Sequence, residues 1–251
     1  MEELKFSVIT VTYNAAGGLE RTIQSVLEQE GVEVEYLVID GGSTDGTVDI
    51  VRRYESRIAY WVSEPDRGLY DAMNKGLEKS TGTYLLFLNA GDVFQRPDTL
   101  AGVAGVARKG GCPDVLYGET DLVDGLGRYM APRRLKAPET LNWKSFRMGM
   151  LVCHQAFIVK REHAPLYDLS YRFSADFDWC IRCMKGAKTL VNTHLRLVYY
   201  QYEGLSTANR KASLKERYRI MQKYYGKTTV FFLHFWFAFR YFRDKMRKKT
   251  V

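Results

Sequence analysis

The segment "TYLLFLNAGDVF" at residues 83–94 joins a run of apolar residues to a short polar turn that ends in Asp92. An aliphatic and aromatic run of this kind predicts a strand that is buried on both faces, as in parallel sheets. A buried strand has no structural need for a carboxylate at its end. We therefore expect Asp92 to interact with a ligand.

Three similar runs precede this one, and helical patterns lie between them. The predicted strands cover residues 5–11, 34–40, 58–63 and 83–89. The predicted apolar helix faces contain Leu19, Ile23, Val26 and Leu27, then Ile50, Val51 and Tyr54, then Leu69, Ala72, Met73, Gly76 and Leu77. Alternation of strands and helices at this spacing predicts an α/β fold with a parallel sheet, right-handed crossovers and helices on both faces.

Polar loops follow all four predicted strands: "TYN" at 12–14, "DGGSTDGT" at 40–47, "EPDRG" at 64–68 and "NAGD" at 89–92. Ligands of such sheets bind beyond the carboxyl ends of the strands, so we expect a site at this edge. Loops of this composition also turn the chain and cap helices, and residues 43–45 are typical of a cap. Neither GxxxxGK[ST] nor GxGxxG occurs here, so a bound diphosphate would need a divalent cation, Mn²⁺ or Mg²⁺, on Asp92.

The phrases "SVITVTYN", "VIDGGSTDGT", "SEPDRGLYDAMNKGL" and "YLLFLNAGD", in this order over residues 6–92, resemble the nucleotide-sugar half of family 2 glycosyltransferases. These enzymes have the GT-A fold. The phrase "EPDRGLYDAMNKG" is similar to a subfamily that builds bacterial surface polysaccharides. The resemblance implies an inverting transfer of a sugar from a nucleoside diphosphate sugar to an acceptor hydroxyl, with UDP preferred over GDP or dTDP.

The same resemblance implies roles for individual residues. Thr12 and Tyr13 would line the nucleotide pocket, Asp40 would hydrogen-bond the base, and Asp92 would bind the metal. The predicted nucleotide site is completed by Asn14, Asp66, Arg67, Asn89, Ala90 and Gly91. Many relatives have an acidic residue at the position of Asn89, so we expect metal ligation to depend on Asp92 alone.

The acceptor side is predicted to contain the segment "SADFDWCIR" at residues 174–182. An inverting transfer needs a general base near the acceptor hydroxyl, and the resemblance places that base at Asp176. We expect Ser174 to cap the helix and Asp176 to lie in its first turn. Alternatively, Asp176 only complements the helix dipole. Ala175 replaces the acidic residue that precedes the base in the family pattern.

Two other polar features have competing interpretations. His154, in the phrase "HQAFIV", either contacts the substrate or metal or is a structural histidine. Cys180 and Cys183 form a lone CxxC, which could be a redox or metal pair. Phe177, Cys180, Ile181 and Met184 share one helical stripe, so we expect the two cysteines to pack in the core.

The net charge of +8 is concentrated at the end of the chain, where residues 240–251 contain six Lys and Arg residues and one Asp. They follow "VFFLHFWFAF" at residues 230–239, which is too short to span a bilayer, a length that takes about 20 apolar residues. Residues 227–251 are therefore predicted to lie on an anionic membrane surface, which favours a polyprenyl-diphosphate-linked glycan acceptor. The alternative is a helix packed on the core or in a dimer interface.

The phrase "YEGLS" at 202–206 is predicted to close over the diphosphate.

We expect one compact domain with a helical tail: a nucleotide-sugar half at 1–118, an acceptor half with the base at 119–205, and a membrane-associating tail at 206–251. The acidic start and short apolar run of "MEELKFSVITV" do not resemble a signal peptide, which predicts an enzyme at the cytoplasmic face of the plasma membrane. A nucleotidyltransferase would need a basic phosphate loop, and "TYNAAGGLE" lacks a lysine. A noncatalytic nucleotide- or membrane-binding module is the other alternative. Confinement of the charge to an aromatic tail argues against nucleic acid binding.

Overall fold

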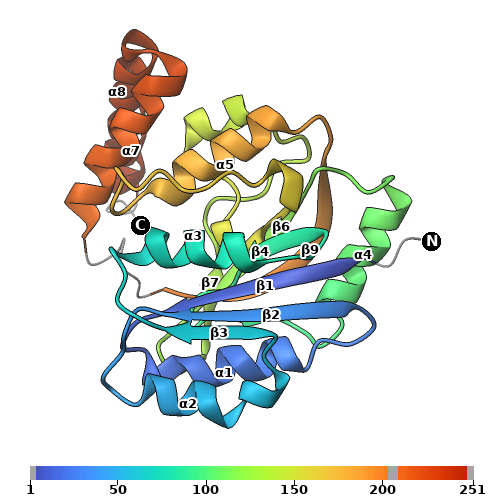
Figure 1. The fold of residues 1–251 in the computed structure, drawn as a ribbon. Coiled ribbons are helices and arrows are strands. Elements are labelled where there is room, and N and C mark those ends of the chain that lie inside the picture. The colour runs from blue at the N-terminus through green and yellow to red at the C-terminus, as the bar shows by residue number, and fades with distance from the viewer. Residues whose placement is uncertain (1–3, 203–208, 248–251) are drawn as a thin grey trace.

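A mixed sheet of nine strands runs through the computed structural model, which describes residues 4–202 and 209–247 (Figure 1). The order across the sheet is β3 (Tyr60–Ser63), β2 (Glu33–Asp40), β1 (Lys5–Thr12), β4 (Tyr84–Phe87), β8 (Phe157–Lys160), β6 (Val115–Val123), β9 (Leu190–Gln201) and β5 (Val93–Phe94), and β7 (Tyr129–Pro132) pairs with β6. The first four strands in this order are parallel. The four predicted strands and their parallel arrangement are thus confirmed, with shifts of a few residues at their ends.

The second half of the sheet is mixed, which the sequence did not predict. Strand β8 runs antiparallel to both of its neighbours, β4 and β6. Its amino end therefore lies at the same edge as the carboxyl ends of β1 and β4. As a result, His154 and Gln155, in the short 3-10 helix His154–Ala156 just before β8, come to the edge where a ligand site is expected.

Helices cover both faces of the sheet (Figure 1). One face packs against α1 (Ala16–Leu27), α2 (Thr47–Arg53) and α4 (Thr99–Lys109). The other packs against α3 (Leu69–Lys79), α5 (Ala175–Gly186), α7 (Arg210–Tyr225) and α8 (Lys227–Arg247). The side chains of β1 alternate between the layers, with Val8 in the first core and Ile9 in the second. Burial on both faces explains why the parallel strands are predominantly apolar.

The C-terminal helices α7 and α8 are partly built into the core. Ile220 and Met221 of α7 and Val230 of α8 are buried in the same core as α3 and α5. On α8, Leu233 and Phe237 pack against this core as well. No helix among residues 4–202 and 209–247 is long and apolar enough to cross a membrane.

Helix α5 confirms one expectation and corrects another. Cys180 and Cys183 are fully buried, so the CxxC pair belongs to the core, as the helical stripe predicted. Ser174 precedes the helix, but its hydroxyl does not cap it. Instead, the hydroxyl lies 3.0 Å from that of Ser213 on α7, and this contact joins the two helices.

Candidate active site

A cavity of about 450 Å³ opens at the carboxyl ends of β1 and β4. It is lined by the loops after these strands and by residues of α3, α5, α7, the end of β9 and the segment before β8. Eight of the predicted site residues line it: Thr12, Tyr13, Asp66, Asn89, Ala90, Asp92, His154 and Asp176. The fold thus brings the predicted metal ligand and the predicted base into one space.

Four predicted residues do not line this cavity: Asn14, Asp40, Arg67 and Gly91. The carboxylate of Asp40 is buried and accepts hydrogen bonds from the N–H groups of Gly42 (3.0 Å) and Ser43 (2.9 Å) and from the Ser63 hydroxyl (2.6 Å). It therefore organises the loop after β2. Arg67 is exposed and forms an ion pair with Asp71 at 2.8 Å.

Asn14 and Gly91 stabilise the loops without lining the cavity. The Asn14 side-chain oxygen accepts a hydrogen bond from the Thr44 N–H at 2.9 Å. Gly91 has φ +99°, a conformation that disfavours other residues, and a Cβ at this position would overlap Oε1 of Gln201. The glycine is therefore required for the close approach of Gln201.

Asp92 is the most buried of the acidic residues in the cavity wall. It is 3% exposed, and burial raises its pKa to about 7. Its Oδ2 accepts a hydrogen bond from Gln155 Nε2, and its Oδ1 accepts one from the Gln201 N–H, both at 2.9 Å. Both donors come from the half of the chain beyond residue 119, so the carboxylate is oriented by segments that are distant in sequence.

Several buried oxygens near Asp92 have no hydrogen-bond partner among the described residues. They are Thr12 Oγ1, Asn89 Oδ1 and Gln201 Oε1, and all three residues line the cavity. Unpaired buried oxygens are costly unless a ligand satisfies them. Together with the Asp92 carboxylate they form a set of hard oxygen donors, which is the set that Mg²⁺ and Mn²⁺ prefer. The residues present therefore fit a divalent cation.

Asp176 lies in the first turn of α5 and faces the cavity. Its Oδ1 accepts a hydrogen bond from the Tyr70 hydroxyl at 3.2 Å. Asp178, two residues later, is different because it is fully buried and faces α7. It accepts hydrogen bonds from Arg182 Nε (2.6 Å), Lys223 Nζ (3.1 Å) and the Tyr224 hydroxyl (2.8 Å), so it has a structural role.

His154 is held in an aromatic cluster within the cavity wall. Its ring stacks on Phe87 at 5.1 Å, and its Nε2 lies 2.6 Å from the Tyr167 hydroxyl. Burial lowers the pKa of His154 to about 4, so the imidazole is neutral at physiological pH. These contacts are those of a structural histidine, although the residue also borders the cavity.

Sequence reasoning missed six polar cavity residues: Tyr70, Arg133, Gln155, Tyr200, Gln201 and Arg217. Gln155 is next to His154, and Gln201 precedes the predicted loop "YEGLS", so proximity to a recognised phrase could have indicated these two. Neither arginine lies in a recognisable motif. Residues 203–206 of that loop, like 248–251 of the basic tail, lie outside the described residues.

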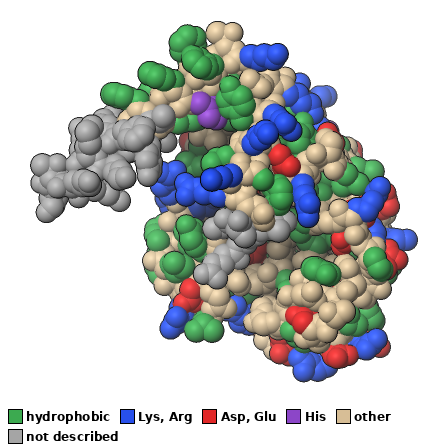
Figure 2. All heavy atoms as spheres, turned by 90° about the vertical axis from the view of Figure 1, so that its left-hand side faces the viewer, with side chains coloured by type: hydrophobic (Ala, Val, Ile, Leu, Met, Phe, Trp, Pro, Cys, Tyr) green, Lys and Arg blue, Asp and Glu red, His purple; other side chains and the backbone are tan. Residues whose placement is uncertain are grey.

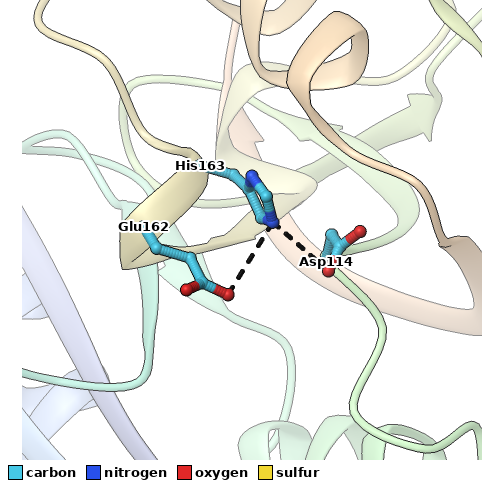
Figure 3. A group of neighbouring side chains, drawn as sticks. All are labelled: Asp114, Glu162 and His163. Carbon is cyan, nitrogen blue, oxygen red and sulfur yellow. Dashed lines mark ion pairs between the residues drawn. The ribbon is translucent and has the colours of Figure 1, made fainter.

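A second acidic group lies at the opposite edge of the sheet, where β6 begins (Figure 3). His163 Nε2 is 3.4 Å from Asp114 Oδ1 and 3.8 Å from Glu162 Oε1. The Lys160 ammonium lies 3.5 Å from the same Asp114 oxygen and would repel a cation. Burial acts to raise the pKa of Asp114. Hydrogen bonds from the N–H groups of Lys188 and Thr189 outweigh this effect, and the pKa falls to about 2. This group is an ion-pair cluster outside the cavity lining.

A model of the family described as "Glycosyl transferase family 2" matches residues 7–164. The chain belongs to glycosyltransferase family 2. Similar proteins include a PGL/p-HBAD biosynthesis glycosyltransferase of Mycobacterium bovis, 33% identical over 211 residues that cover 80% of this chain and 78% of that protein. The putative teichuronic acid biosynthesis glycosyltransferase TuaG of Bacillus subtilis is 41% identical over 93 residues, 36% of this chain and 37% of TuaG.

Solved structures show that this family 2 glycosyltransferase has the GT-A fold, as predicted. S. aureus TarS in complex with UDP-GlcNAc matches with a TM-score of 0.72 at 20% identity, over 87% of this chain and 65% of the TarS chain. The mannosyltransferase PcManGT of Pyrobaculum calidifontis, in complex with GDP-Man and Mn²⁺, matches with a TM-score of 0.63 at 20% identity, over 89% of this chain and 64% of that one. The predicted resemblance to enzymes of bacterial surface polysaccharides is also confirmed.

Proposed function

We propose that this enzyme transfers a sugar, with inversion, from a nucleoside diphosphate sugar to a hydroxyl of a lipid-linked glycan in bacterial surface-polysaccharide biosynthesis. The observation that carries the proposal is that Asp92, the unpaired oxygens and Asp176 all line the same cavity. UDP is the preferred nucleotide, which the TarS complex with UDP-GlcNAc supports. GDP is the alternative, since PcManGT was solved with GDP-Man.

The donor is assigned to the cavity residues within 1–118, with Gln201 of β9 as an additional cation ligand. Thr12, Tyr13, Asp66 and Ala90 would contact the nucleotide sugar, while Asn14, Asp40, Arg67 and Gly91 would shape the loops around it. Asp92, with Asn89 and Gln201, would hold Mn²⁺ or Mg²⁺, and the cation would offset the negative charge of the diphosphate. The Mn²⁺ complex of PcManGT supports a cation of this kind.

The acceptor is assigned to the wall built by residues 119–205, where Asp176 acts as the general base. Tyr70 holds Oδ1, and Oδ2 has no hydrogen-bond donor among the described side chains. The acceptor oxygen forms a bond to the anomeric carbon, and its proton passes to Oδ2. The bond from that carbon to the diphosphate breaks, and its electron pair leaves with the nucleotide. We assign His154 a supporting role, because Tyr167 occupies its Nε2.

Helix α8 supplies the proposed membrane contact. One side of it packs on the core, and the other exposes five aromatic residues: Phe231, Phe232, Phe235, Trp236 and Phe239. Figure 2 shows hydrophobic side chains on this part of the surface and Lys and Arg side chains near them. We propose that this aromatic face and the basic residues up to 251 bind the anionic inner surface of the plasma membrane, where a lipid-linked acceptor would be found.

The test combines binding with transfer. Calorimetry with UDP and with GDP, in Mn²⁺ and in EDTA, should show metal-dependent binding of one nucleotide by the wild type and its loss in Asp92→Ala. Asp176→Asn should retain that binding and lose transfer from the matching sugar nucleotide by about 10²–10⁴-fold, the usual contribution of a general base. The matched control is Asp49→Asn, on the exposed side of α2. Undiminished transfer by Asp176→Asn would refute the assignment of the base.

A further inference from the structure

An arginine of α7 reaches the cavity from outside the two halves that were expected to form it. Arg217 lines the cavity, and its guanidinium lies 5.8 Å from the ring centroid of Phe177, the residue after Asp176. Its Nε is buried and has no hydrogen-bond partner among the residues that the structure describes. Among the described side chains, no hydrogen bond or ion pair holds this guanidinium, so its donors are available to a ligand.

The other arginine in the cavity wall is arranged differently. Arg133 donates hydrogen bonds to the carbonyl oxygens of Met150 (2.6 Å), Leu151 (3.0 Å) and Leu135 (3.1 Å). Arg133 therefore holds the backbone together and has few donors left. Arg217, by contrast, has no anionic partner among the described side chains, and a partly buried charge of this kind is unfavourable until an anion pairs with it. A guanidinium with free donors is well suited to phosphate oxygens.

The position of Arg217 associates it with the acceptor wall. It contacts the α5 turn that carries the proposed base, whereas the proposed cation ligands Asn89 and Asp92 follow β4. The next residue of α7, Tyr218, packs edge-on against His234 of α8 at 4.8 Å. The helix pair that presents the aromatic face to the outside therefore also presents Arg217 to the cavity.

We propose that Arg217 binds the phosphate group that joins the acceptor glycan to its lipid. A lipid-linked acceptor carries phosphate between its lipid chain and the sugar, and α7, the helix that carries Arg217, contacts both α8 and α5. The inference rests on the proposed function, and it deepens it by making the acceptor a phosphate-linked lipid rather than a neutral glycolipid.

The test uses farnesyl diphosphate below its micelle concentration as the probe, added to protein saturated with UDP and Mn²⁺. Arg217→Gln should weaken farnesyl diphosphate binding by about 10–100-fold, the usual value for charge-assisted hydrogen bonds, and leave the Kd for UDP within about twofold. Arg217→Lys should retain part of the affinity. The matched control is Arg219→Gln, which removes an exposed arginine of the same helix and should change neither constant. Farnesol, which lacks the phosphates, should bind wild type and Arg217→Gln alike.

The contrary results are distinct. Weakened UDP binding in Arg217→Gln would assign the arginine to the donor diphosphate and overturn the inference. Wild-type affinity for farnesyl diphosphate in that variant, or no binding of this probe by the wild type, would also overturn it. If Arg217→Gln fails to fold, Arg217→Lys decides: a loss of affinity as large as the roughly 10–100-fold expected for a neutral side chain would contradict a phosphate contact. Absence of UDP binding by the folded wild type would instead remove the proposed function itself.

Discussion

Replacement of Asp92 by Asn is expected to make the protein more stable while it removes the cation site. The carboxylate has a pKa of about 7 in the folded protein against 3.8 for the ordinary group, because burial disfavours its charged form. The folded state therefore binds more protons than the unfolded state between these values, and stability falls as the pH rises through this range. At 1.36 kcal/mol per pH unit, the penalty reaches about 4 kcal/mol above pH 8 and about half of that at pH 5.5.

Asparagine avoids this penalty but has only one acceptor oxygen. It loses one of the two hydrogen bonds from Gln155 and Gln201, which costs about 1 kcal/mol. The net gain of about 3 kcal/mol at pH 8 corresponds to a Tm higher by about 6–12 °C for a chain of this size, and by less than half of that at pH 5.5.

The assay is thermal unfolding of the wild type and Asp92→Asn in EDTA at both pH values, then with Mn²⁺ at pH 8. We expect Mn²⁺ to raise the Tm of the wild type and to leave that of the variant unchanged, because a bound ion stabilises only the form that binds it. A variant whose stability follows that of the wild type within about 0.5 kcal/mol at both pH values would refute the reasoning.

Three further predictions concern other parts of the molecule. Asp178→Ala leaves Arg182 and Lys223 without their shared partner and should destabilise the protein by about 3 kcal/mol in urea unfolding, whereas Asp49→Ala should not. Gly91→Ala places a side chain on a residue with φ +99° and against Gln201. It should destabilise the fold by about 1–3 kcal/mol and weaken Mn²⁺ binding. The control Gly17→Ala, where a Cβ meets no atom within 4 Å, should have neither effect. Phe231→Ser with Phe235→Ser should lower co-sedimentation with anionic vesicles about tenfold without affecting UDP binding, while Leu126→Ser, at an exposed leucine elsewhere, should have no effect.

The donor wall was predictable because its residues directly follow strands with a strong local pattern. Thr12 and Asp92 come at or just after the ends of apolar runs, and parallel strands place such ends at one edge. Asp40 shows the limit of this reasoning. Its position at the end of β2 was correct, yet its carboxylate binds its own loop, since hydrogen-bond partners depend on side-chain geometry that the sequence pattern does not specify.

The facing wall was less predictable because it depends on pairings between distant segments. Gln155 reaches the site only because β8 runs antiparallel between β4 and β6, and no local periodicity indicates the direction of a short strand. Ser174 was expected to cap α5, but the hydroxyl of Ser213, 39 residues away, provides its contact. Arg217 was missed for the same reason. It reaches the cavity through the packing of α7, a helix that the sequence analysis assigned to a tail.

The two hydrogen bonds to Asp92 limit how independently the donor and acceptor halves of this enzyme can be exchanged. The side chain that binds the cation in our proposal belongs to the donor half, while Gln155 and the Gln201 backbone, which orient it, belong to the acceptor half. A chimera that joins residues 1–118 to the acceptor half of a relative would inherit Asp92 without these donors, unless the relative has a matching glutamine and strand end. New acceptor specificity obtained by exchanging halves would therefore carry a change in metal affinity with it.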